Sequence, residues 1–259
     1  MIDFFGVTAP QLETFILVMI RVFGMLAVFP IFSAPQVPQH VRFGFGLLIS
    51  FILFKVVPPI AALPSMYDLV AAVVAQVVLG VIIGFVASLV FVSFQFAGEL
   101  IDLQIGFAVA NVLNPLTQQN VTIIGELELA LATLVFLATD SHHLLIQGIA
   151  GSFTLVPLPF ISLNPRVMWD AVSFLSLALV DVFKIAAPPA GALFLTNVAL
   201  AFMARVAPQM NVFVVGFPIQ IGVGLTVLAL SLSLLGVVGP DMFHDVALQM
   251  DTVMRGLRM

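Results

Sequence analysis

Apolar residues gather along the chain into runs that are long on the scale of a lipid bilayer. A membrane-spanning helix needs roughly 20 mostly apolar residues. Run 69–96 is the cleanest, because no charged residue interrupts it. We therefore expect an all-α polytopic membrane protein of about six to eight hydrophobic helices with no soluble domain. The runs cover residues 12–32, 41–57, 69–96, 123–138, 144–161, 167–187, 191–206 and 212–238.

The last residues, 241–259, follow a different pattern. Apolar side chains recur every three or four residues from Met242 to Leu257, with charged or amide residues between them. This spacing predicts an amphipathic helix, which lies on a membrane surface or packs on a partner subunit. Because its polar face has only two basic residues, Arg255 and Arg258, we favour the partner subunit.

Composition supports the membrane assignment and excludes several function classes. The chain is 62% apolar and 8% charged, whereas a soluble domain has about 45–50% apolar and roughly 25% charged residues. Only 8 Lys and Arg residues are present, so the basic face that a nucleic-acid-binding protein needs is missing. There is no cysteine, which excludes disulfides, thiolate nucleophiles and Cys-ligated metals.

A polar cluster follows run 69–96. Gln95, Glu99 and Asp102 are spaced i, i+4 and i+7, which places them on one face of a helix, and Gln104 follows. Polar groups at membrane depth are costly, and they commonly mark functional sites. We therefore predict a functional polar helix face here.

Residues 106–120 fit neither a membrane helix nor an ordinary soluble loop. The segment has no Lys, Arg, Asp or Glu and is rich in small and amide residues. Two interpretations stay open: a loop that lines or blocks a pore, or an interfacial loop whose amides meet water. The residues that carry the first interpretation are Gly106, Phe107, Asn111, Asn114, Pro115, Gln118, Gln119 and Asn120.

Other polar groups have simpler interpretations. Glu126 and Glu128 are two apart, so they cannot share a helix face, and we favour a helix end at the interface over a proton relay. His142 and His143 are adjacent and point apart on a helix, which favours an interfacial turn over a metal site. Asp181 and Lys184 are three apart and can neutralise each other.

The sequence has no motif for covalent or phosphate chemistry. A P-loop and a nucleophile elbow are both missing from it. We therefore expect a protein that is not an enzyme, with no catalytic, cofactor-binding or metal-ligating residues.

Prolines punctuate the C-terminal third of the chain. Pro188, Pro189, Pro208 and Pro218 are expected to break helices, because proline lacks a backbone donor. A buried guanidinium at Arg205 would need an anionic or carbonyl partner. We predict a packing motif that comprises Arg205, Pro208, Gln209, Asn211, Phe213, Gly216 and Pro218.

Two strings carry a resemblance to a known family. The first runs from Asn197 through Arg205 and the Ala-Pro-Gln-Met-Asn-Val-Phe run (207–213) to Gly-Phe-Pro at 216–218. The second joins Gln-Phe-Ala-Gly at 95–98, Gln-Ile-Gly-Phe at 104–107 and Asn-Pro at 114–115. Together they resemble the FliR family of type III export-gate proteins, over essentially the whole chain.

The resemblance implies an assembly and a task. One copy of such a chain joins FliP- and FliQ-type subunits in a spiral of helical hairpins, on FlhB- and FlhA-type subunits, in the bacterial inner membrane at the flagellar basal body. Residues 1–190 would be FliP-like and 191–259 FliQ-like, with unfolded export substrates passing a plug at 106–120. Many apolar helices would then meet other subunits in place of lipid. The alternatives are a virulence-type counterpart and a secondary transporter of a small molecule.

Overall fold

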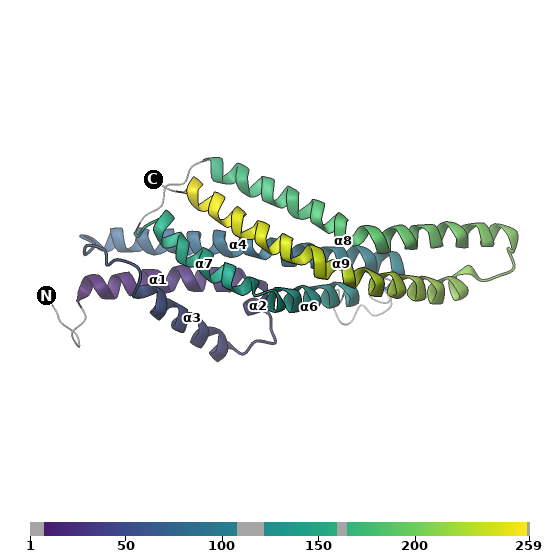
Figure 1. The fold of residues 1–259 in the computed structure, drawn as a ribbon, viewed down its shortest axis with the longest axis horizontal. Helices are drawn as coiled ribbons and strands as arrows, with labels where there is room; N and C mark the ends of the chain where they lie inside the picture. The colour runs from purple at the N-terminus through teal and green to yellow at the C-terminus, as the bar shows by residue number, and fades with distance from the viewer. Residues whose placement is uncertain (1–7, 108–121, 160–164, 258–259) are drawn as a thin grey trace. The chain divides into compact units, whose positions relative to one another are not determined.

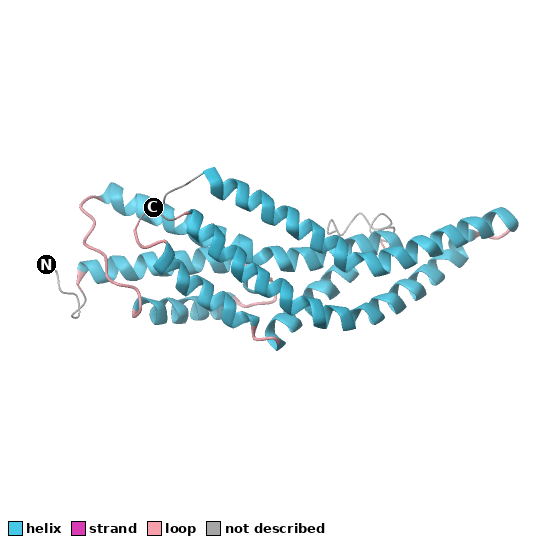
Figure 2. Ribbon diagram, turned by 45° about the horizontal axis from the view of Figure 1, so that its top comes forward, coloured by secondary structure: helices cyan, strands magenta, loops and turns pink. Residues whose placement is uncertain are grey.

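The computed structural model describes residues 8–107, 122–159 and 165–257. Within these ranges the chain forms helices and loops without a strand, as Figure 2 shows. The helices are α1 (Ala9–Val28), α2 (Pro30–Ser33), α3 (Gln39–Phe54), α4 (Met66–Ile105), α6 (Ile123–Ala138), α7 (Ser141–Leu155), α8 (Pro165–Val206) and α9 (Val212–Gly256).

Four helical stretches are long and apolar enough to cross a membrane. They are α1, α4, residues Trp169–Val206 of α8 and residues Val214–Ser233 of α9. The protein is therefore an all-α, multi-pass membrane protein, as the hydrophobic runs predicted. Helices α3, α6 and α7 have 16, 16 and 15 residues, which is short of the roughly 20 that a bilayer requires.

The predicted runs match the helix boundaries in one case and differ from them in others. Run 123–138 matches α6 to the residue. The separation of 167–187 from 191–206 is wrong, because α8 continues through Pro188 and Pro189. Helix α9 likewise continues through Pro218 and Pro240. Membrane helices tolerate proline where neighbouring groups satisfy the freed backbone. Pro208 lies at a real break, between α8 and α9.

The chain divides into two compact units, each built from segments distant in sequence. Unit 1 comprises residues 1–89, 141–175 and 244–259, and unit 2 comprises 90–140 and 176–243. Helices α4, α8 and α9 each contribute to both units. The boundary predicted near residue 190 falls inside α8 and stays a prediction.

In unit 1, α1 and α4 meet at glycines. A β-carbon on Gly80 would lie 2.3 Å from the carbonyl oxygen of Arg21, and one on Gly84 would lie 2.6 Å from that of Met25. Gly80 and Gly84 are four apart, the spacing at which small residues let two membrane helices approach closely. This crossing fixes α1 against the first half of α4.

In unit 2, three aromatic rings from three helices pack together in the core. Phe91 of α4, Phe136 of α6 and Phe243 of α9 have ring centroids 5.2–5.4 Å apart. The Ser93 hydroxyl donates to the Ala178 carbonyl of α8 at 3.0 Å. Figure 1 shows that the unit 2 portions of α8 and α9 run side by side as a hairpin closed by residues 207–211.

The C-terminal amphipathic segment has a different partner from the one predicted. It is the last part of α9, and its apolar stripe is buried within this chain, including Met250, Val253 and Leu257. A β-carbon on Gly148 of α7 would lie 2.6 Å from the Met250 methyl carbon. The expectation that this stripe meets lipid or another subunit is therefore wrong. Periodicity defines an apolar face but cannot say which surface covers it.

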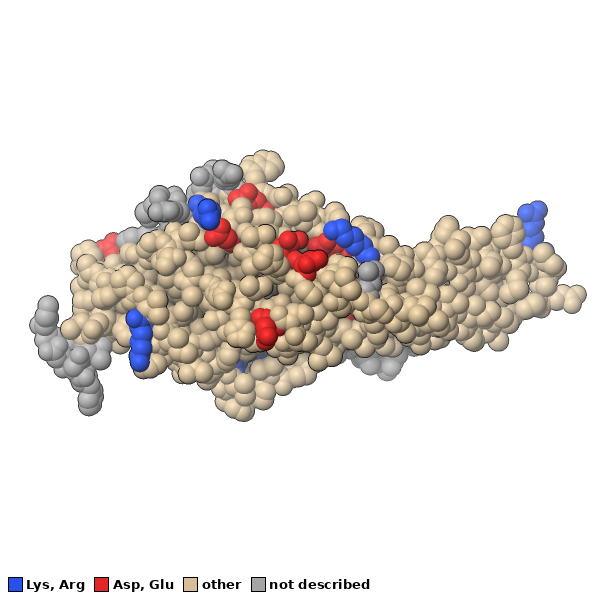
Figure 3. Space-filling model, in the orientation of Figure 1, with Lys and Arg blue, Asp and Glu red and all other residues tan. Residues whose placement is uncertain are grey.

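Charged side chains are sparse on the surface. On the face drawn in Figure 3, charged side chains cover only a small part of a surface that consists mostly of other residues. Lys184 and Asp181 form the predicted ion pair, with nitrogen and oxygen 2.9 Å apart. Such a surface suits lipid or other apolar subunits.

Candidate functional site

The polar helix face predicted from Gln95 to Gln104 lies at the end of α4, where Gln95 and Glu99 are half-buried and Asp102 is buried. Both carboxylate oxygens of Asp102 accept from the backbone N–H of Ile124, at 3.2 and 3.0 Å. Ile124 is in the first turn of α6, whose own N-cap, Thr122, makes no side-chain cap bond. Asp102 therefore caps α6 from another helix and places negative charge at its positive end.

Close packing holds the two helices at this junction. A β-carbon on Gly98 would lie 2.6 Å from the Cα and 2.7 Å from the backbone nitrogen of Gly125. Backbone atoms cannot move aside as a flexible side chain can, so any larger residue at 98 must separate α4 from α6. The Gly98 contact and the Asp102 cap together fix the start of α6.

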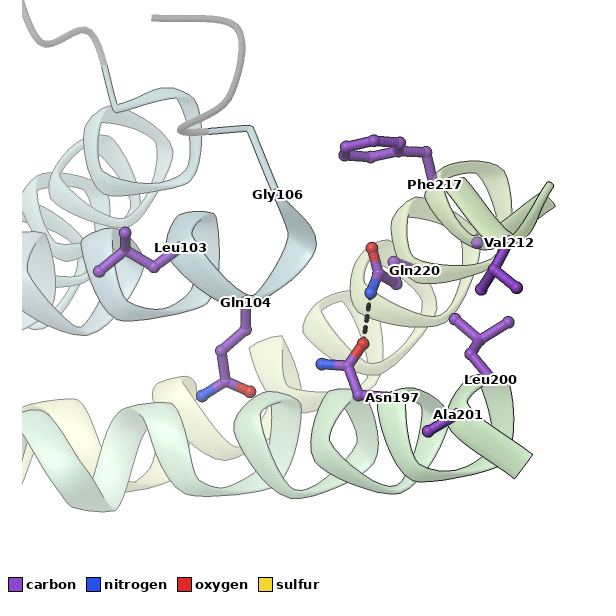
Figure 4. Close-up of a pocket in the computed structure, with 10 residues that line it drawn as sticks. Leu103, Gln104, Gly106, Asn197, Leu200, Ala201, Val212, Phe217 and Gln220 are labelled. Carbon is purple, nitrogen blue, oxygen red and sulfur yellow. Dashed lines mark hydrogen bonds between the residues drawn. The ribbon is translucent and has the colours of Figure 1, made fainter. Parts of the chain in front are cut away.

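A cavity of about 580 Å³ opens beside the end of α4, and we call it the amide pocket. Its walls come from the ends of α4 and α8 and from the start of α9, all in unit 2. Figure 4 shows Gln104 extending from α4 toward α8, while Asn197 and Gln220 point toward each other from α8 and α9. The lining residues are Leu103, Gln104, Gly106, Asn197, Leu200, Ala201, Val212, Gly216, Phe217 and Gln220.

The amide pocket joins the two strings that carried the family resemblance. Gln104 and Gly106 come from one string, and Asn197 and Gly216 come from the other. Gly106 has a φ of +94°, and a β-carbon there would lie 2.7 Å from the Phe217 ring. Glycine is thus required at position 106 both by the backbone and by the neighbouring ring.

One hydrogen bond joins two of the residues that line the pocket. The Gln220 side-chain nitrogen donates to the Asn197 side-chain oxygen. The Asn197 amino group and the Gln220 carbonyl oxygen are not used in that bond. Gln104 has no side-chain hydrogen bond to another described residue. The pocket therefore presents amide donors and acceptors that the described part of the chain does not use.

The predicted pore segment falls mostly outside the described residues. Gly106 and Phe107 are described, and their N–H groups donate to the Asp102 carbonyl at 3.0 and 3.1 Å. This turn ends α4 at the edge of the amide pocket. The remaining predicted residues, Asn111, Asn114, Pro115, Gln118, Gln119 and Asn120, lie outside the described residues.

The proline-containing motif occupies the turn between α8 and α9. Arg205 is exposed, so the guanidinium considered as a buried group is not buried. Pro208, Gln209, Asn211 and Pro218 are also exposed. Gly216 is buried and lines the amide pocket, whereas the Phe213 side chain lies outside the described residues. The motif thus presents polar groups outward.

A second polar group of residues, in unit 1, was not predicted as a site. Arg21 is fully buried in α1. Its Nε donates to the Gln76 side-chain oxygen at 2.7 Å, and Nη1 donates to the Ser152 carbonyl at 2.9 Å and hydroxyl at 3.1 Å. Nη2 donates to the Val156 carbonyl at 3.0 Å. The guanidinium carbon also lies 4.1 Å from the Phe153 ring centroid. We call these residues the Arg21 cluster.

The Arg21 cluster ties three helices together through neutral acceptors. Ser152 lies in the last turn of α7 and Val156 directly follows the helix. The Ser152 carbonyl also accepts from the Val156 N–H at 2.9 Å, whereas carbonyls at the end of a helix have no donor further along it. The Gln76 amide nitrogen donates to the Pro159 carbonyl at 2.7 Å, which extends the network past the helix end. A positive charge here also matches the negative end of the helix. Arg21 therefore caps α7 from α1.

Further polar predictions have mixed outcomes. Glu126 is exposed and Glu128 is buried, which confirms that they occupy different faces of α6. One Glu128 carboxylate oxygen is buried without a hydrogen-bond partner in the described structure. Burial raises the pKa of Glu128 to about 7, in a helix outside the four candidate spans. The His142 and His143 ring centroids are 4.2 Å apart, so the prediction that these rings point apart is wrong.

Comparison with known proteins decides the family. The family model described as "Bacterial export proteins, family 1" matches residues 12–246. The chain belongs to this family. A flagellar biosynthetic protein FliR of Bacillus subtilis is 33% identical, covering 88% of this chain and 90% of its own length. Those of Pectobacterium carotovorum and Caulobacter vibrioides are 32% and 31% identical, covering 88% and 92% of this chain and 87% and 96% of their own lengths.

The residues matched by the bacterial export proteins, family 1, include those that form both polar sites. The match includes the Arg21 cluster and all walls of the amide pocket. The resemblance seen in the two sequence strings is thereby confirmed. Sequence reasoning missed the Arg21 cluster, although an Arg in the middle of an apolar run and a Gln in another were visible signals.

Proposed function

We propose that the chain is a structural, channel-forming subunit of the flagellar protein export gate in the bacterial inner membrane. It conducts unfolded flagellar proteins, and the segment 106–120 helps to close the pore. The observation that carries this proposal is the family match over residues 12–246, together with relatives named as flagellar biosynthetic proteins. We assign it no catalytic step.

Uneven burial of the spans supports a place inside a larger assembly. Within this chain, 39% and 44% of the most apolar windows of α1 and α4 are buried, against 22% and 17% for α8 and α9. Large apolar side chains such as Phe194 and Phe202 are exposed on α8. We propose that FliP- and FliQ-type subunits cover this hairpin, with FlhB- and FlhA-type subunits nearby and one copy of this chain in each complex.

A deletion strain tests the function directly. In a flagellated bacterium that lacks this chain, we expect no hook or filament protein in the medium, and restored secretion on complementation. Export at the normal rate without the chain would contradict the proposal. Co-expression with FliP- and FliQ-type subunits should yield a stable complex, and a well-behaved monomer that never associates with them would contradict the proposed assembly.

Ion conductance tests the closing role of 106–120. Deleting part of this segment should raise ion leakage through the assembled complex, because an uncharged plug would be removed. A deletion of the exposed Pro35 and Gln36, in the loop between α2 and α3, serves as the control. Unchanged conductance in the plug variant would contradict the assignment.

A further inference from the structure

We infer that the amide pocket binds the main chain of a translocating polypeptide, with Gln104, Asn197 and Gln220 hydrogen-bonding to its peptide groups. This inference rests on the proposed function and adds to it a specific contact site. The ligand class is an extended polypeptide, recognised by its backbone and not by its side chains.

The three amides come from three different helices and line one cavity. Gln104, Asn197 and Gln220 all lie within candidate membrane spans. All three residues are half-buried and line the cavity, so a group that enters the cavity can reach their amides. Only the Asn197–Gln220 bond pairs amides across the pocket. Among the described residues, the remaining donors and acceptors have no partner, so they can bond to a bound group.

The unused groups match a peptide bond in kind. The Asn197 amino group is a donor, the Gln220 carbonyl oxygen is an acceptor, and the Gln104 amide offers both. Each peptide unit other than that of proline also carries one donor and one acceptor, whatever its side chain. Amides that face a peptide backbone can therefore replace the hydrogen bonds that it loses on leaving water.

The walls suit passage of many sequences. None of the ten lining residues is charged, so the pocket neither holds nor repels a substrate according to its charge. Leu103, Leu200 and Phe217 provide apolar surface beside the amides. The volume of about 580 Å³ lies within the roughly 300–1,000 Å³ that is usual for ligand pockets.

Site-specific crosslinking in the assembled gate tests the contact. A photoreactive benzoylphenylalanine replaces Ala201, an exposed pocket residue, in cells whose gate holds an arrested export substrate. We expect a covalent adduct with the substrate. The same probe at Leu195, exposed on α8 outside the pocket, is the matched control. Adducts from Ala201 only with a partner subunit, or only within this chain, would overturn the inference.

Export rates supply a second test. Gln104→Ala should slow the export of substrates with unrelated sequences by a similar factor, about two- to tenfold, since one hydrogen bond is lost. Gln147→Ala removes an exposed amide of α7 and should change nothing. Asn197→Asp keeps the shape and adds charge, so acidic substrates should slow more than basic ones. An unchanged rate in both pocket variants would overturn the inference.

The outcomes separate the inference from the proposed function. If the deletion strain cannot export while Gln104→Ala and Asn197→Asp export normally, only the pocket inference fails. If the deletion strain exports normally, the proposed function fails. If a pocket variant prevents assembly, the crosslink from position 201 still tests the pocket inference, because that probe leaves all three amides in place.

Discussion

The Arg21 cluster and the amide pocket both place polar side chains among apolar helices, but they differ in how far those groups are satisfied. Four hydrogen bonds and an aromatic ring surround the Arg21 guanidinium. In the amide pocket one bond joins Asn197 to Gln220, and Gln104 has none to another described side chain. A saturated network stabilises a fold, whereas an open one is available to a ligand. The first site therefore serves structure, and the open amide groups of the second support the inference that it binds a polypeptide.

The largest expected effect tests the saturated site. Arg21→Gln should destabilise unit 1 by about 2–6 kcal/mol, because the buried Gln76 side-chain oxygen and the buried Val156 carbonyl each lose their donor. Thermal unfolding of the purified gate complex in detergent measures this loss. Arg255→Gln, which removes an exposed ion pair with Asp251, is the control and should leave the melting temperature unchanged. Equal melting temperatures for Arg21→Gln and the wild type would contradict the structural role.

Glu128 is an intermediate case, because it is buried and one of its carboxylate oxygens has no hydrogen-bond partner in the described part of the chain. Its pKa rises from 4.5 to about 7 on folding, so the folded protein keeps a proton that the unfolded chain releases between these values. Stability should therefore fall by about 3 kcal/mol as pH rises through this window, and then stay level. Glu128→Gln should flatten the profile, and Glu126→Gln, exposed on the same helix, should not. A wild-type profile that is flat from pH 4.5 to 7 would contradict the shift.

The next largest loss of stability is expected at the contact between α4 and α6. Gly98→Ala should destabilise unit 2 by about 1–3 kcal/mol, because the new methyl group meets the Gly125 backbone. Gly222→Ala is a matched control in α9, where a β-carbon has no atom within 4 Å. Unfolding in detergent should separate the two variants. Equal stability would show that α4 and α6 can move apart without cost.

The smallest effect concerns the α6 cap. Asp102→Ala should cost about 1–2 kcal/mol, since the N–H of Ile124 loses its acceptor. Asp102→Asn keeps an acceptor oxygen and should recover part of that stability. Hydrogen exchange of the Ile124 amide should be faster in Asp102→Ala than in Asp102→Asn. Equal exchange rates in the two variants would contradict the cap.

The helices could be predicted from sequence because hydrophobic runs report directly on local structure. Run 123–138 agrees with α6 to the residue. The helix breaks predicted at Pro188 and Pro218 are wrong, because both prolines lie inside continuous helices. A local rule cannot anticipate how neighbouring groups satisfy a freed carbonyl.

The two sites could not be predicted in full, because they depend on contacts that leave no pattern in the local sequence. Arg21 binds backbone carbonyls at Ser152 and Val156, and every residue carries a carbonyl. No sequence pattern marks those two. The amide pocket was closer to prediction, because Gln104 and the Asn197–Pro218 string had been singled out separately. Their meeting around one cavity required the fold.

The most direct test of this contrast measures melting temperature and export rate in Arg21→Gln and Gln104→Ala gates side by side. We predict that Arg21→Gln lowers the melting temperature and the yield of assembled gate, while Gln104→Ala leaves both unchanged and slows export per assembled gate by about two- to tenfold. A Gln104→Ala gate that melts as early as Arg21→Gln, and exports normally once assembled, would contradict the account.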